Sequence, residues 1–121
     1  MDSNKSVQLL DLSTIENLKS LGNEGDTPFI NTIVELYFQE STRLMNELKE
    51  YSKQNDFHQL QMNAHTLKGS SANIGAVAFS AICKEIEFCC RDNITDNISE
   101  LIDKAEECFL QTKAALTEQI K

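Results

Sequence analysis

Residues that interrupt helices are rare in this sequence. Its 121 residues include one proline and four glycines, no tryptophan, two tyrosines and six phenylalanines. Proline and glycine are the poorest helix formers, so their scarcity favours helices. The low aromatic content suits a helical bundle better than a β-sandwich or a barrel. At this length the chain can form one domain around one buried core.

Positive charge is also scarce. Eleven lysines and arginines stand against nineteen aspartates and glutamates, which gives a formal net charge of -8. No basic stripe interrupts this acidic composition, so we expect neither nucleic acid nor an anionic membrane as a partner. Acidity excludes these two classes but does not by itself name a partner.

Long apolar runs are absent too. No stretch of the sequence approaches the roughly 20 apolar residues of a membrane-spanning helix. Residues 1–7 are mostly polar and carry no apolar core of a signal peptide. We therefore expect a cytoplasmic protein, and Met1 with the modest tails favours a stand-alone protein over a domain cut from a larger kinase.

The cysteines lack the spacing of a metal or redox motif. No C-x-x-C pair occurs, and a zinc site would want better spacing and more than the two histidines present. In a reducing cytosol such residues are free thiols that pack as small apolar side chains. This prediction covers all four cysteines, Cys83, Cys89, Cys90 and Cys108.

Helices are what the remaining pattern predicts. A short helix is expected over residues 9–21, capped by Asp11 or Ser13 and stopped by Gly22, with a loop over residues 22–26. Thr27-Pro28 is expected to open a second helix, with the hydroxyl as cap and proline at the first helical position. Its apolar stripe comprises Ile30, Ile33, Val34, Tyr37, Leu44 and Leu48, and runs on toward Tyr51.

Three more helices follow after short links. Asn55-Asp56 caps the third, whose inner residues are Phe57, Leu60, Ala64, Leu67 and Ser71, before a turn at Gly75. The fourth helix ends at residues 91–93 and is expected to bury Val77, Phe79, Ile82, Ile86 and Cys90. The fifth starts at Thr95 or Asn97 and carries Ile98, Leu101, Ile102, Ala105, Phe109 and Leu116.

Short links between long amphipathic helices make sequential helices antiparallel neighbours. The sequence therefore predicts an all-α fold, an antiparallel up-down four-helix bundle with a short extra N-terminal helix over one end. We expect a single domain over residues 1–121, with its core over about residues 9–120.

His65 is expected to face water. Each helical residue turns about 100° around the axis, which places His65 about 140° from the centre of the apolar stripe of the third helix. Its neighbours one turn away are Gln61, Met62, Lys68 and Gly69.

This neighbourhood is unusual for a solvated helix face. Glycine inside a helix costs about 1 kcal/mol relative to alanine, so Gly69 suggests a need for open space beside the imidazole. Lys68 brings an ammonium that can steady phosphate oxygens, and Ser70 adds a hydroxyl. Neutral imidazole is well populated near neutral pH, which suits nucleophilic attack.

A surface histidine without a task is the alternative reading of His65. His58 occupies a similar angular position about 10 Å away along the helix axis, too far to share a metal with His65. We interpret His58 as solvated.

The segment around His65 resembles the signature of histidine phosphotransfer (HPt) domains. That pattern is His-x-Leu-Lys-Gly, two positions of Ser or Ala, three of any type, Gly, then Ala or Leu. The sequence matches it without a gap in Ala64-His65-Thr66-Leu67-Lys68-Gly69-Ser70-Ser71-Ala72-Asn73-Ile74-Gly75-Ala76. The order of expected helices is also similar to that of the family over nearly the whole chain.

The resemblance implies a role for each matching position. His65 would accept the phosphoryl group at its outward ring nitrogen, Lys68 would assist the phosphate, Gly69 would keep the space open, and Gly75 would shape the turn. The family often has Gln on the fourth helix near the histidine, whereas this chain has Glu87 there. That carboxylate could orient the imidazole but would repel a phosphate. Docking would use Gln61, Met62, Ala72 and Ala76.

The resemblance further implies a phosphocarrier without kinase activity of its own. It would relay phosphoryl groups between response-regulator receiver domains, with a hybrid sensor histidine kinase upstream, and would act as a monomer. The partner receiver would supply the aspartate and Mg²⁺. The sequence itself shows no P-loop or other nucleotide-binding pattern, and we expect no metal or cofactor bound to this chain.

Two other functions are weighed against this one. A non-catalytic helical adaptor could use the same face to bind receiver domains, although the intact His65, Lys68 and Gly69 argue against it. A metal-binding bundle would need ligands that converge inside the bundle, such as Glu-x-x-His pairs, and none occurs.

Overall fold

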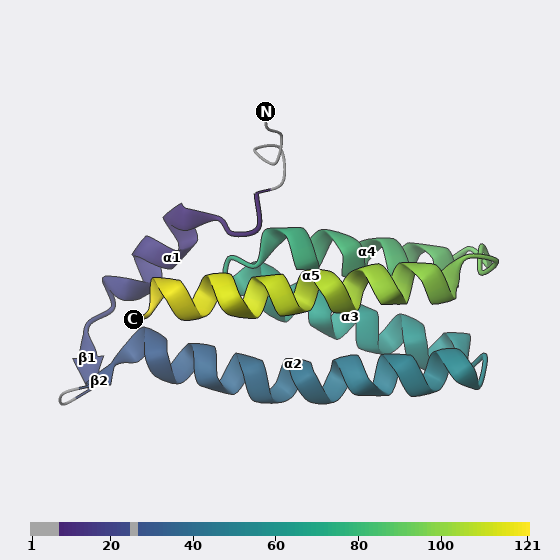
Figure 1. The fold of residues 1–121 in the computed structure, drawn as a ribbon, viewed down its shortest axis with the longest axis horizontal. Helices are drawn as coiled ribbons and strands as arrows, with labels where there is room; N and C mark the ends of the chain where they lie inside the picture. The colour runs from purple at the N-terminus through teal and green to yellow at the C-terminus, as the bar shows by residue number, and fades with distance from the viewer. Residues whose placement is uncertain (1–7, 25–26) are drawn as a thin grey trace.

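Four long helices dominate the computed structural model, which describes residues 8–24 and 27–121 (Figure 1). Consecutive helices run antiparallel through short links. Helix α3 packs against α2 and α4, and α5 closes the bundle against α4 and α2. The bounds are α2 (Phe29–Lys53), α3 (Phe57–Asn73), α4 (Val77–Arg91) and α5 (Ile98–Gln119). The predicted antiparallel four-helix bundle is confirmed.

Helix α1 (Leu12–Lys19) lies at the end of the bundle where α2 begins and α5 ends (Figure 1). Asp11 caps α1, because its carboxylate accepts a hydrogen bond from the Ser13 amide at 3.1 Å. The Asp11 amide in turn donates to the Gly75 carbonyl at 2.8 Å, and Ile15 is fully buried. The extra helix is therefore fastened to the turn between α3 and α4.

The predicted start of the second helix is wrong. Thr27 and Pro28 form a short strand, β2 (Thr27–Pro28), that pairs antiparallel with β1 (Asn23–Glu24). Pro28 has an extended backbone and stands at the N-cap position, so α2 begins at Phe29, one residue later than predicted. Backbone pairing between the two strands outweighed the local capping pattern. The rest of the expected loop, residues 25–26, lies outside the described residues.

The inner face of α3 matches the prediction, and this fixes the direction in which His65 points. Leu60, Ala64, Leu67 and Ser71 are fully buried. The hydroxyls of Tyr37 on α2 and Ser71 on α3 share a hydrogen bond of 2.7 Å inside the bundle. The side of α3 opposite to this row must therefore face solvent.

The inner face of α4 differs from the prediction at its start. Val77 is exposed and Ile82 is only partly buried, whereas Cys83 is fully buried. Phe79, whose ring lies 5.0 Å from that of Phe109 on α5, sets the register. Val77 precedes Phe79 by two residues, which places it on the other side of the helix.

The cysteines and the apolar segments add no special feature to this fold. All four cysteines are free thiols, and burial raises the pKa of Cys90 to about 11. Within residues 8–24 and 27–121, no helix combines the length and apolar character that crossing a membrane requires.

Candidate functional site

His65 projects from the solvent side of α3, as the helix register predicts. Its side chain is 67% exposed. Gly69 follows one turn later, and a Cβ atom added there would have nothing within 4 Å. Met62, one turn before His65, is also exposed. The imidazole is thus open to approach along its own helix.

Glu87 on α4 makes direct contact with the imidazole. Its Oε2 atom lies 2.8 Å from Nδ1 of His65, and its side chain is only 13% exposed. The orienting role that the sequence left uncertain for Glu87 has the geometry it requires. This bond occupies Nδ1 and leaves Nε2 as the ring nitrogen that points away from the contact.

Lys68 completes a chain of three charged or polar side chains. Its Nζ atom lies 2.7 Å from Oε1 of Glu87, so the carboxylate bridges Lys68 and His65. Partial burial alone would raise the pKa of the Glu87 carboxyl, but hydrogen bonds from Lys68 and His65 outweigh this effect and lower it. Glu87 is therefore ionised at neutral pH, and Lys68 offsets the charge that would repel a phosphate.

An ionised Glu87 selects one form of the neutral imidazole. A carboxylate can only accept hydrogen bonds, so Nδ1 of His65 must carry the proton. The lone pair then resides on Nε2, the exposed nitrogen. Second partners of this kind commonly fix which nitrogen of a histidine is free to react. The arrangement orients the imidazole of His65 and leaves its Nε2 lone pair exposed.

A shallow hollow borders the imidazole of His65. Its volume is about 270 Å³, and it is lined by Gln61, Met62, His65, Thr66 and Glu87. The structure thus brings two of the predicted docking residues, Gln61 and Met62, next to His65. Ala72 is exposed on the same helix.

The structure excludes Ala76 from the predicted docking surface. Ala76 is fully buried at the start of α4. The segment that precedes α1 is hydrogen-bonded to residues on either side of Ala76. The Asp11 amide donates to the Gly75 carbonyl, and the Ala78 amide donates to the Leu9 carbonyl. The sequence pattern could not show that this segment covers the turn.

Ser70 is not brought to His65 either. Its hydroxyl donates to the Leu67 carbonyl at 3.4 Å, and its side chain borders a hollow between α2 and α3. Ser70 follows His65 by five positions, which places the two on different sides of α3. The described geometry gives Ser70 no contact that would let it assist a phosphate on His65.

Two residues near Glu87 were not singled out from the sequence. Phe88 is exposed, and the guanidinium of Arg91 lies 5.2 Å from the centre of its ring. The sequence signal that could have identified this pair is the three-residue spacing of Phe88 and Arg91, directly after Glu87. They are an exposed apolar and a basic side chain that follow Glu87 on α4.

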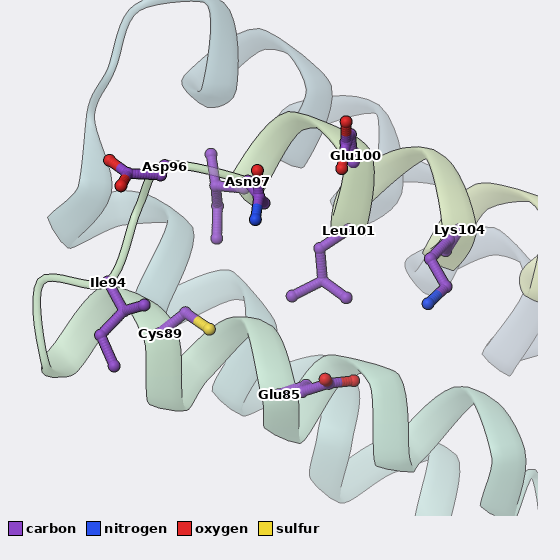
Figure 2. A pocket seen from close by; sticks show the side chains of 9 residues that line it. Glu85, Cys89, Ile94, Asp96, Asn97, Glu100, Leu101 and Lys104 are labelled. Carbon is purple, nitrogen blue, oxygen red and sulfur yellow. The ribbon is translucent and has the colours of Figure 1, made fainter.

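Another hollow, shown in Figure 2, lies between the end of α4 and the start of α5. Its volume is about 390 Å³, and its charged lining residues are Glu85, Asp96, Glu100 and Lys104. Three carboxylates against one ammonium would repel a phosphate, and His65 is not among its lining residues. No group of three or more His, Cys, Asp or Glu side chains is arranged to hold a metal ion in the described part of the chain.

Comparison with known proteins agrees with this geometry. The family model described as "Hpt domain" matches residues 32–120. The chain is 35% identical over 85 residues to histidine-containing phosphotransfer protein 1 of Arabidopsis thaliana, covering 61% of this chain and 55% of that protein. It is 33% identical over 76 residues to histidine-containing phosphotransfer protein 5 of the same plant, covering 60% and 48%.

A solved structure shows the same fold. Histidine-containing phosphotransfer protein B of Pseudomonas aeruginosa PAO1 superposes with a TM-score of 0.82 at 23% identity, over 92% of this chain and 93% of the other. The chain spans about half the length of the curated plant relatives it matches, because the aligned shares of those proteins are 48% and 55%.

Proposed function

This chain belongs to the Hpt domain family, and on that premise we propose that His65 accepts a phosphoryl group from a receiver-domain aspartate and passes it to another receiver domain. The observation that carries the proposal is the bond of 2.8 Å between Glu87 and Nδ1, which directs the nucleophilic Nε2 of an exposed histidine into solvent.

The transfer step needs little from this chain beyond position. The Nε2 lone pair of His65 attacks phosphorus, the bond from phosphorus to the aspartate oxygen breaks, and the aspartate leaves as a carboxylate. The Nδ1 proton stays in its bond with Glu87. Phosphoryl transfer depends mainly on alignment and charge neutralisation, and the partner receiver with its Mg²⁺ would supply most of both.

The surface around His65 fits this division of labour. Met62, one turn before His65, and Phe88, next to Glu87 on α4, are exposed apolar side chains, and Arg91 offers a positive charge beside Phe88. These contacts suit docking of a protein whose phosphorylated site is anionic. We propose a cytoplasmic, monomeric carrier without kinase activity, which receives its phosphoryl groups in a relay that starts at a hybrid histidine kinase.

Incubation with a radiolabelled, phosphorylated receiver domain tests the function. The wild-type protein should take up label that acid removes and base does not, as expected for phosphohistidine. His65→Gln removes the nucleophile and should abolish the label. His58→Gln is the matched control, because His58 is exposed on the same helix about two turns earlier, and it should be labelled like the wild type.

Two outcomes would contradict the proposal. Equal labelling of His65→Gln and wild type would place the phosphoryl group elsewhere. Binding of a receiver without any transfer, measured by calorimetry alongside the labelling, would identify the chain as a non-catalytic adaptor.

A further inference from the structure

The carboxylate of Glu87 is the feature of this site that the proposed function does not require. A neutral amide at this position could also accept the bond from Nδ1, and the family resemblance leads one to expect such a side chain. This chain instead places an ionised group, 13% exposed, at 2.8 Å from the ring. Its charge must affect the phosphorylated state of His65 as well as the free one.

The chemistry of phosphohistidine shows where that charge acts. When Nε2 carries the phosphoryl group, the ring is a cation if Nδ1 keeps its proton and neutral if it does not. From the cation, the P–N bond breaks with its electron pair returning to Nε2, and neutral imidazole leaves. From the unprotonated ring, an imidazolide anion would have to leave, which is far less favourable. The phosphoryl group passes to water or to a receiver aspartate in either case.

The charges that face Nδ1 oppose one another, and the nearest is negative. Glu87 touches Nδ1 directly, whereas the Lys68 ammonium touches the far oxygen of that carboxylate. Interaction energy falls with distance, so the carboxylate dominates. An opposite charge in direct contact favours the charged form of a titrating group.

More distant charges are exposed or already partnered. Lys84 and Arg91 lie on α4 about one turn to either side of Glu87 and are exposed, and Arg91 also contacts Asp92. From α2, Glu47 reaches α3 by accepting a bond from Asn63, two residues before His65 and hence on another side of the helix. None of these side chains contacts the imidazole.

We propose that Glu87 sets the pH range over which phosphorylated His65 releases its phosphoryl group, by holding the proton on Nδ1. This inference rests on the proposed function and deepens it. Glu87 keeps the phosphorylated ring in its releasing form to higher pH than a neutral side chain would. Lys68 moderates the effect through its contact with the carboxylate.

Chemical labelling tests the inference without a receiver. Phosphoramidate transfers a phosphoryl group directly to histidine, and after its removal the loss of phosphate can be followed by phosphorus NMR from pH 4 to pH 10. Glu87→Gln keeps an acceptor for Nδ1 but removes the charge, and should move the midpoint of the rate profile down by about one pH unit. Above the midpoint this corresponds to a loss rate about tenfold slower than that of the wild type.

Two further variants fix the sign and serve as controls. Lys68→Met removes the opposing cation and should move the midpoint upward. General loosening of the site would shift the midpoints of Glu87→Gln and Lys68→Met in the same direction, so opposite shifts identify the effect of charge. Glu85→Gln removes a carboxylate from the exposed outer part of α4 and should leave the profile unchanged. Circular dichroism checks that each variant is folded.

The outcomes separate the inference from the proposed function. A Glu87→Gln profile that superposes on the wild-type profile overturns the inference, as does a shift of Glu87→Gln and Lys68→Met in the same direction. Failure of phosphoramidate to label wild-type His65 removes its premise, a reactive Nε2. Labelling by phosphoramidate with the predicted shifts, but no labelling by any receiver, would contradict the proposed function alone.

Discussion

Gly69 lies one helical turn beyond His65 inside α3, and a methyl group added there would meet nothing within 4 Å. Gly69→Ala should therefore raise the free energy of unfolding by up to about 1 kcal/mol, since alanine is the better helix former and no clash opposes it. Urea unfolding at neutral pH measures this gain. The glycine thus lowers the stability of the helix that carries His65.

We attribute this loss of helix stability at Gly69 to the need for open access to His65. Gly69→Leu should retain the fold but slow transfer from a phosphorylated receiver, because the added side chain fills the approach to the imidazole. Single-turnover transfer rates for wild type, Gly69→Ala and Gly69→Leu should decrease in that order. A leucine variant that transfers as fast as the wild type would show that Gly69 does not keep the approach open.

The sequence was sufficient to predict which way these residues face, but not what they touch. The apolar spacing of α3 determined its buried side, and that placed His65, Met62 and Gly69 on the outside. The bridge of Glu87 between His65 and Lys68 depends on how α4 slides along α3 and on side-chain conformations. No pattern within one helix contains that information.

At the scale of elements, the turn between α3 and α4 holds α1 in place. Gly75 has a φ of +84°, and a Cβ atom there would lie 3.1 Å from the Asp11 carbonyl oxygen and 3.3 Å from side-chain atoms of Ile15 and Thr14. The left-handed backbone of Gly75 and the close passage of α1 therefore both require glycine.

Gly75→Ala should destabilise the protein more than Gly22→Ala does. Gly22 has a φ of +93° but nothing within 4 Å of an added Cβ, so its variant reports backbone strain alone, about 1–2 kcal/mol. The excess loss in Gly75→Ala, seen in urea unfolding of the two variants side by side, measures the clash with α1. Equal losses would mean that α1 yields to the methyl group without cost.

Errors in the predicted elements occur where backbone groups pair outside the helices. Residues 23–24 pair with 27–28, and α2 starts after Pro28; the segment before α1 is hydrogen-bonded to Gly75 and Ala78, on either side of the buried Ala76. Caps formed by adjacent residues, such as Asp56 at the start of α3, were predictable because the carboxylate and the Gln59 amide it accepts from lie three residues apart.

For the whole molecule, the buried bond between Tyr37 and Ser71 links α2 to the helix that carries His65. Burial raises the pKa of Tyr37 to about 12, from 10 for an exposed tyrosine. Below pH 10 the hydroxyl is neutral in both the folded and the unfolded chain. Between pH 10 and pH 12 only the unfolded chain releases this proton, so the folded state loses stability as the pH rises.

Tyr37→Phe should separate the stability that comes from the hydrogen bond to Ser71 from the stability that depends on the raised pKa of Tyr37. At neutral pH it should lower the free energy of unfolding by about 1–3 kcal/mol, because the buried Ser71 hydroxyl loses its partner. Between pH 10 and pH 12 the difference from wild type should shrink by about 2–3 kcal/mol, the linkage expected for a shift of about two units. Urea unfolding across this range would contradict the account if the two proteins lost stability in parallel.

Under the proposed function, transfer through His65 on one face of the bundle also limits how a relay through this chain can proceed. The hollow beside His65 and the open space at Gly69 both lie next to this single imidazole. A donor receiver and an acceptor receiver must therefore bind the same surface in turn, and the two compete for it. Under the proposed function the kinetics would be ping-pong, and an excess of unphosphorylated donor would inhibit delivery to the acceptor.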